Sequence, residues 1–128
     1  MAKKILIVED DTFLRELISQ KLSNEGYDIT EAADGEQGLK ELEKEKPDLI
    51  LLDLILPGLD GFEFLSKIKE DAQLSGVPVI ILSNLGQKDD IEKALQMGAD
   101  DYLIKAHFTP GEIVNKVKGV LGETETQT

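Results

Sequence analysis

The sequence predicts an α/β fold, a single doubly wound (βα)5 unit in which five parallel strands alternate with five helices. Short apolar runs of strand length alternate along the chain with segments of helical spacing. Residues 49–52 form an unbroken apolar run between Asp48 and Asp53, typical of a strand buried on both faces of a parallel sheet. The 128 residues fit one domain, without a repeat or linker. We assign residues 1–122 to this domain and 123–128 to a disordered tail.

The individual elements follow from hydrophobic periodicity and turn residues. The expected strands are residues 5–8, 27–31, 49–52, 77–82 and 100–104. The expected helices contain the apolar positions within residues 13–22, 39–42, 62–68, 91–95 and 113–121. The second strand alternates apolar and polar residues, which favours a sheet edge. The last helix opens with a capping box at residues 109–112. This alternation indicates the flavodoxin-like strand order 2-1-3-4-5, with helices on both faces.

The composition excludes several classes of function. With 26 acidic and 14 basic residues, the net charge is −12, which repels nucleic acid and anionic lipid but suits a cation or a basic partner surface. The chain has no cysteine, so disulfides and thiolate chemistry are excluded. The first apolar run, Ile5–Val8, is too short for a signal peptide or a membrane span. We therefore expect a cytoplasmic protein that binds neither nucleic acid nor membranes directly.

Asp53 ends the central apolar run. Because an unpaired carboxylate is costly to bury, we expect Asp53 to project from the carboxyl edge of the sheet, where open α/β sheets bind ligands. Pro57 and Gly58 predict a tight turn after it, and Gly61 is expected to be a second flexible point. A simpler interpretation is that Asp53 only caps this turn.

Four of the five predicted strands end in polar residues that suit one site. Glu9 and Asp10 follow the first strand, Asp53 the third, Ser83 the fourth and Lys105 the fifth. The acids converge where the first and third strands are neighbours, and Mg²⁺ would relieve their repulsion. Lys105 and Ser83 suit a phosphoryl group, for which the ionised Asp53 is a nucleophile. Taken singly, each residue also has a structural explanation, as helix N-terminal charge, turn former or surface lysine.

Together these motifs resemble the receiver domain of two-component response regulators, over residues 3–121. The matching segments are residues 5–11, 51–61, 81–84, 98–102 and 103–105. The resemblance implies that Asp53 is the phosphoacceptor and that Mg²⁺ is held by Asp10 and Asp53. Glu9 would act through metal-bound water, and the backbone carbonyl of Ile55 would complete the protein ligands.

The same resemblance implies that Ser83 and Lys105 bind the phosphoryl group and that Tyr102 is a switch that moves with Ser83. We expect a stand-alone receiver, not an enzyme, that catalyses its own phosphorylation and dephosphorylation. Its donor would be a histidine kinase or phosphotransfer protein. It would signal to a downstream protein through the fourth helix, fifth strand and fifth helix, as a monomer or a phosphorylation-dependent dimer.

Three alternatives fit the sequence less well. A pseudo-receiver would bind partners without phosphorylation, but the acids, serine and lysine are all present. A phosphatase of the haloacid dehalogenase type would need a second aspartate where this chain has Ile55. Flavin binding would need a phosphate loop, and residues 9–11 are acidic instead.

The chain departs from the family pattern after Lys105. Receivers commonly have a cis proline there and then Phe, whereas this chain has Ala106, His107 and then Phe108. A cis bond without proline would cost about 2.5 to 4 kcal/mol, so we expect a trans Lys105-Ala106 bond, a bulge over 106–108 and a solvent-facing His107. By resemblance, Ile55 and Leu85 flank the path of attacking water, and as apolar residues they predict a long-lived phosphoryl adduct.

Overall fold

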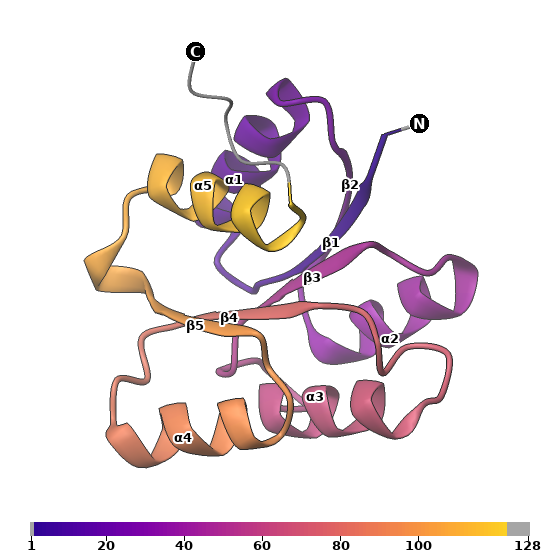
Figure 1. The fold of residues 1–128 in the computed structure, drawn as a ribbon, viewed down its shortest axis with the longest axis vertical. Coiled ribbons are helices and arrows are strands. Elements are labelled where there is room, and N and C mark those ends of the chain that lie inside the picture. Colours follow the sequence, from indigo (N-terminus) through magenta and orange to yellow (C-terminus); the bar gives the residue numbers. More distant parts are fainter. Residues whose placement is uncertain (1, 123–128) are drawn as a thin grey trace.

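A computed structural model describes residues 2–122, and it confirms the predicted fold class and strand order. All neighbouring strands are parallel, in the order β2-β1-β3-β4-β5 (Figure 1). The strands are β1 (Lys4–Val8), β2 (Asp28–Ala32), β3 (Leu49–Leu52), β4 (Val79–Ser83) and β5 (Asp101–Ile104). The helices are α1 (Thr12–Asn24), α2 (Gly35–Lys44), α3 (Gly61–Glu70), α4 (Lys88–Gln96) and α5 (Pro110–Val120), with a 3₁₀ turn η1 (Lys105–His107) before α5.

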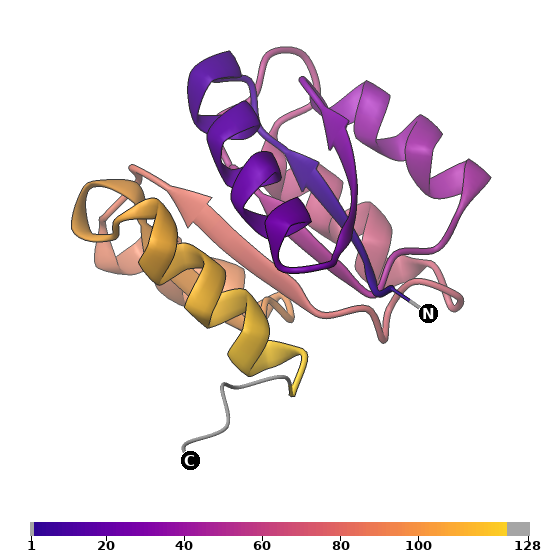
Figure 2. The ribbon, with the colours of Figure 1, turned by 90° about the horizontal axis from the view of Figure 1, so that it is seen from above.

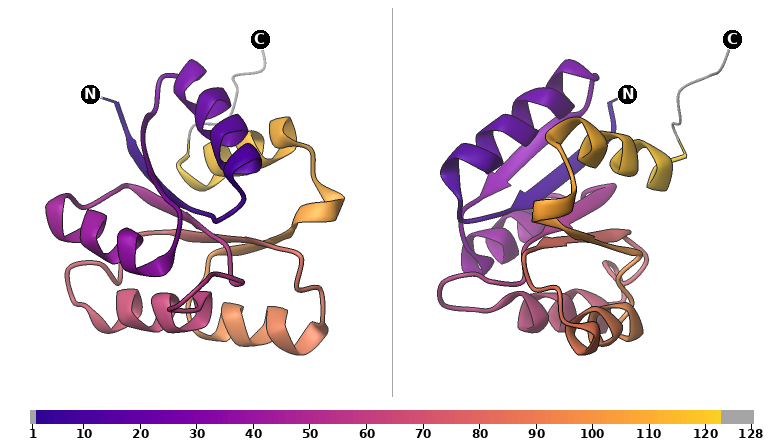
Figure 3. Two further views of the ribbon diagram at one scale, coloured as in Figure 1. Left: turned by 180° about the vertical axis from the view of Figure 1, so that it is seen from behind. Right: turned by 90° about the vertical axis from the view of Figure 1, so that its left-hand side faces the viewer.

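The sheet lies between two helical layers. Helices α1 and α5 cover one face, and α2, α3 and α4 cover the other (Figures 1 and 2). In β1, Ile5 and Ile7 pack in the core beside α1 and α5, whereas Leu6 and Val8 pack in the core on the opposite face. Views from behind and from the side show the same three layers (Figure 3). This two-sided burial explains why the central strands are continuous apolar runs.

Four helices begin with a capping side chain near the carboxyl edge of the sheet. In each, the cap accepts a hydrogen bond from the backbone N–H three residues later. The caps are Asp11, Asp34, Asp60 and Thr109. Helix α4 has no such side-chain bond at its cap, Gln87, and its only buried residue is Ala94. It is therefore the helix with the weakest anchoring.

The segment after β5 confirms one prediction and corrects another. The Lys105-Ala106 bond is trans, as is every other peptide bond among the described residues. The expected bulge is wrong, because residues 105–107 form the η1 turn, which the Phe108 N–H closes by donating to the Lys105 carbonyl at 3.4 Å. An i→i+3 turn absorbs the extra residue and gives that carbonyl a partner. His107 is exposed, as predicted.

Strand β4 begins at Val79 and not at Val77, because Pro78 has no N–H to donate to the sheet. The Pro78 carbonyl still accepts from the Ile50 N–H at 2.9 Å. The predicted tail, 123–128, lies outside the described residues. Within residues 2–122, no helix is both long and apolar enough to cross a membrane.

Candidate functional site

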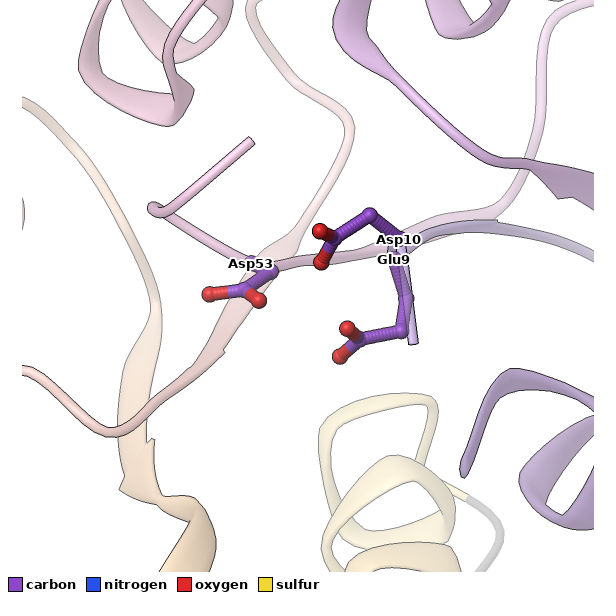
Figure 4. A group of neighbouring side chains, drawn as sticks. All are labelled: Glu9, Asp10 and Asp53. Carbon is purple, nitrogen blue, oxygen red and sulfur yellow. The ribbon is translucent and has the colours of Figure 1, made fainter. Parts of the chain in front are cut away.

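Three carboxylates meet at the carboxyl edge of the sheet. Glu9 and Asp10 follow β1, and Asp53 follows the neighbouring β3 (Figure 4). Each offers an oxygen within 4.8 Å of the others. Glu9 is 2% and Asp53 is 4% exposed, whereas Asp10 is open to solvent. The predicted convergence of the acids is therefore confirmed.

The Lys105 ammonium joins this cluster from the end of β5. Its Nζ donates to Asp53 Oδ2 at 2.8 Å and lies 2.8 Å from Glu9 Oε1. The second contact is an ion pair without hydrogen-bond geometry, so the buried Glu9 Oε1 has a charge partner but no hydrogen-bond donor. The site thus holds one cation among three acids.

Burial dominates the electrostatics of Glu9. Loss of solvent raises the pKa of Glu9 to about 7, against the lowering effects of Lys105 and of the Asp11 N–H. Burial alone would lower the pKa of Lys105, but the neighbouring carboxylates of Asp53 and Glu9 outweigh that effect and raise it. The ammonium therefore stays charged, while Glu9 changes its charge near neutral pH.

Local backbone contacts orient the acids. The Ile55 N–H donates to Asp53 Oδ1 at 3.1 Å, so Asp53 also shapes its turn, as the simpler interpretation expected. The Asp11 N–H donates to Glu9 Oε2 at 3.0 Å. Arg15 Nη1 donates to the Glu9 carbonyl at 2.7 Å. Arg15 was not predicted as a site residue, because an arginine on a helix is usually a surface charge.

Gly61 has a different function from the one predicted. Its φ is not positive. A Cβ at this position would lie 2.3 Å from the Leu54 Cα and 2.5 Å from the Asp53 carbonyl oxygen. Gly61 is therefore required for close backbone approach beneath Asp53 and not for flexibility.

Ser83 and Tyr102 are linked through the backbone of Leu85. Ser83 is fully buried at the end of β4, and its Oγ accepts from the Leu85 N–H at 3.2 Å. The Tyr102 hydroxyl donates to the Leu85 carbonyl. Burial raises the pKa of Tyr102, which keeps it a hydroxyl donor. One loop residue thus contacts both predicted switch residues.

A pocket of about 320 Å³ opens above Asp53. It is lined by Asp10, Asp11, Asp53, Ile55, Asn84 and Lys105. The predicted metal-binding and phosphoryl-binding positions Asp10, Asp53, Ile55 and Lys105 therefore share one cavity. Asp11 and Asn84 were not predicted as pocket residues. The only sequence signal for them is that Asp11 directly follows Asp10 and Asn84 directly follows Ser83.

The donor set fits a hard divalent cation. Oxygen ligands are what such cations prefer, and three clustered carboxylates with one ammonium leave net negative charge. The buried Glu9 Oε1 has no hydrogen-bond partner beyond its ion pair with Lys105, so it could accept a further bond from a metal-bound water. Asp10, Asp53 and Glu9 would hold this cation, directly or through water.

Comparison with known proteins assigns the family. The model of the response regulator receiver domain matches residues 5–118. The chain is 39% identical over 121 residues to the phosphate regulon transcriptional regulatory protein PhoB of Klebsiella pneumoniae, covering 94% of this chain and 52% of that protein. It is 40% identical over 125 residues to the alkaline phosphatase synthesis transcriptional regulatory protein PhoP of Bacillus subtilis, covering 98% and 51%.

Solved structures agree with this assignment. A CheY-like response regulator receiver domain protein from Methanospirillum hungatei has a TM-score of 0.88 at 33% identity, covering 96% of both chains. The Mn²⁺-bound form of the response regulator Rcp1 has a TM-score of 0.84 at 28% identity, covering 98% of this chain and 99% of that chain. The chain belongs to the receiver domain family of two-component response regulators. It spans about half the length of the curated relatives named above, and the expectation of a stand-alone protein stays a prediction.

Proposed function

We propose that this receiver accepts a phosphoryl group on Asp53, with Mg²⁺, from the phosphohistidine of a sensor kinase or phosphotransfer protein. The observation that carries the proposal is the Lys105 ammonium 2.8 Å from Asp53 Oδ2, in the pocket that Asp10 shares. As the P–N bond of the donor breaks, a P–O bond to Asp53 forms. Bound Mg²⁺ would supply positive charge to the phosphoryl oxygens.

The chain's own residues would assist this transfer in three ways. The Ile55 N–H and the Lys105 ammonium fix the two oxygens of Asp53, so the carboxylate needs no reorientation. Lys105 neutralises charge that develops on the phosphoryl group. The Ser83 hydroxyl lies at the neighbouring strand end and would donate to a phosphoryl oxygen.

The proposed readout face is α4, β5 and α5. Ser83 and Tyr102 both contact Leu85 in the loop that leads into the weakly anchored α4. If the Ser83 hydroxyl turned toward Asp53 to donate to the phosphoryl group, the bond that its oxygen accepts from the Leu85 N–H would be strained, and this would bias the loop. Amide shifts upon binding of a phosphoryl mimic should concentrate in residues 84–118, and shifts that spare this range would contradict the proposed face.

The partner that we propose for phosphotransfer presents a complementary surface. Phe13 is 77% exposed and Ile55 is 54% exposed, and they extend from the residues that follow β1 and β3. The net charge of −12 favours a basic rim around this apolar contact. This acceptor role, with a cytoplasmic location, is proposed for the module of residues 1–122.

A small acyl phosphate tests the proposed function without a partner. Incubated with Mg²⁺, the protein should gain one phosphoryl group by intact-mass spectrometry, and excess chelator should abolish the gain. Because the pocket is acidic, an anionic donor needs the cation before it can approach. No adduct with Mg²⁺ would favour the pseudo-receiver instead, and adduct formation in excess chelator would contradict the proposed metal dependence.

A further inference from the structure

Asn84 is a pocket residue to which the proposed function gives no role. It directly follows β4, which neighbours β3 on the side opposite β1. Asn84 therefore approaches Asp53 from the side away from Glu9 and Asp10. It is exposed and lines the 320 Å³ pocket. Asn84 therefore lies at the solvent-exposed rim of the pocket.

The six lining residues differ in their hydrogen-bonding chemistry. Ionised Asp10, Asp11 and Asp53 only accept hydrogen bonds, Lys105 only donates them, and Ile55 has an apolar side chain. One Asp11 oxygen already accepts from the Leu14 N–H. The Asn84 carboxamide is the only lining side chain that both donates and accepts. A water held for attack on a phosphoryl group needs both kinds of partner, because its proton requires an acceptor and the phosphoryl oxygens require a donor.

Leu85 was predicted to flank the path of attacking water, but it lies away from the pocket. Its side chain packs against the core cluster beside α3 and α4, and it is not among the residues lining the pocket. Its N–H and carbonyl are engaged by Ser83 and Tyr102. Of the two apolar residues on which a long-lived adduct was predicted, only Ile55 lines the pocket.

We propose that the Asn84 carboxamide orients the water that hydrolyses the Asp53 phosphoryl adduct, an inference that rests on the proposed function. Water attacks phosphorus on the side opposite Asp53, and the P–O bond to Asp53 breaks. Asp53 leaves as a carboxylate, inorganic phosphate is released, and the proton lost by water passes to solvent. The carboxamide oxygen accepts from the water, and the NH₂ donates to a phosphoryl oxygen. Asn84 neither gains nor loses a proton.

The test measures loss of the adduct after the acyl phosphate is removed, with Mg²⁺ present. Asn84→Ala should lengthen the adduct half-life about tenfold, less than the 10²- to 10⁴-fold effect of true proton transfer. Asn84→Leu has nearly the same shape without the hydrogen bonds, and it should slow hydrolysis at least as much. Asn84→Gln retains the carboxamide and should recover part of the rate.

Comparing Asn84→Ala with Asn84→Leu shows whether Asn84 orients the attacking water or only keeps water out of the pocket. If Asn84 only blocked the pocket, Asn84→Ala would speed hydrolysis and Asn84→Leu would not, which overturns the inference. An unchanged half-life in both variants overturns it as well. Gln87→Ala is the matched control, because Gln87 is exposed in the same loop but does not line the pocket. A wild-type chain that forms no adduct overturns the proposed function too, whereas an adduct insensitive to Asn84 overturns only this inference.

Discussion

The two edges of the sheet place similar charged residues in opposite settings. At the amino edge, Lys4 pairs with Glu45 and lies 3.9 Å from Asp28, and the three side chains are 37%, 54% and 62% exposed. At the carboxyl edge, Lys105 also meets two acids, but it is 16% exposed, and Glu9 and Asp53 are 3% and 4% exposed at their side chains. Water screens the first cluster and not the second.

This contrast shows that burial, more than residue type, makes a charged cluster chemically useful. The buried cluster shifts the pKa of Glu9 to about 7 and leaves one of its oxygens without a hydrogen-bond donor. The exposed cluster has solvent as an alternative partner for each group. Matched substitutions at the two edges test this difference, beginning with the largest expected effect.

Asp53→Asn should abolish the phosphoryl adduct, whereas Asp48→Asn at the amino edge should leave it unchanged. Both aspartates flank β3, and Asp48 Oδ2 accepts from the Lys4 N–H at 2.7 Å, which an asparagine oxygen can replace. Only Asp53 lies beside Lys105. Intact-mass spectrometry after acyl phosphate treatment measures the adduct, and an adduct on the Asp53→Asn variant would refute the acceptor assignment.

Gly61→Ala should destabilise the fold by about 3 kcal/mol, since the new Cβ meets backbone atoms that cannot move freely. Its nearest contacts would be at 2.3 and 2.5 Å, whereas a Cβ at Gly76, before β4, would have nothing within 4 Å. Gly76→Ala is the amino-edge control and should be neutral or slightly stabilising. Urea denaturation gives both free energies of unfolding, and equal values would show that the Asp53 turn tolerates displacement.

Lys105→Met should cost about 2 kcal/mol of unfolding free energy without Mg²⁺. Breaking a buried ion pair costs roughly 3 to 5 kcal/mol, and protonation of Glu9 relieves part of that. Added Mg²⁺ should recover stability, because it binds only the folded site. Lys4→Met, in the exposed cluster, should hardly shift the urea midpoint. A larger loss in Lys4→Met than in Lys105→Met would reverse the comparison.

Mg²⁺ affinity should be about eightfold weaker at pH 6 than at pH 7.5, because Glu9 must lose its proton to serve the cation. In the folded protein the pKa of Glu9 lies above its ordinary value of 4.5. Without metal, the stability that protonated Glu9 contributes is therefore lost as the pH rises through about 7. Calorimetric titration measures the affinity. Glu9→Gln should remove this pH dependence of the Mg²⁺ affinity. If the dependence persists in the variant, a titrating group other than Glu9 causes it.

The sequence by itself was sufficient for the fold class and for the acids, the serine and the lysine of the site, but not for Arg15, Asp11 or Asn84. The central strands β1, β3 and β4 are buried on both faces, so their apolar runs are unbroken and are followed by Glu9, by Asp53 and, at the end of β4, by Ser83. Local chemistry also determined the helix starts, since the capping box at Thr109 is formed as predicted. Such features depend on neighbours within a few residues, which the sequence displays directly.

Only the tertiary structure decided which of these residues meet and how they are held. Lys105 reaches Asp53 across β4, roughly 10 Å away in the sheet, so burial and side-chain direction determine the contact. The close approach at Gly61, the inward backbone of Leu85 and the pocket position of Asn84 likewise depend on segments distant in sequence. The spacing of residues along the chain does not determine these distances, because they depend on how strands and helices pack in three dimensions.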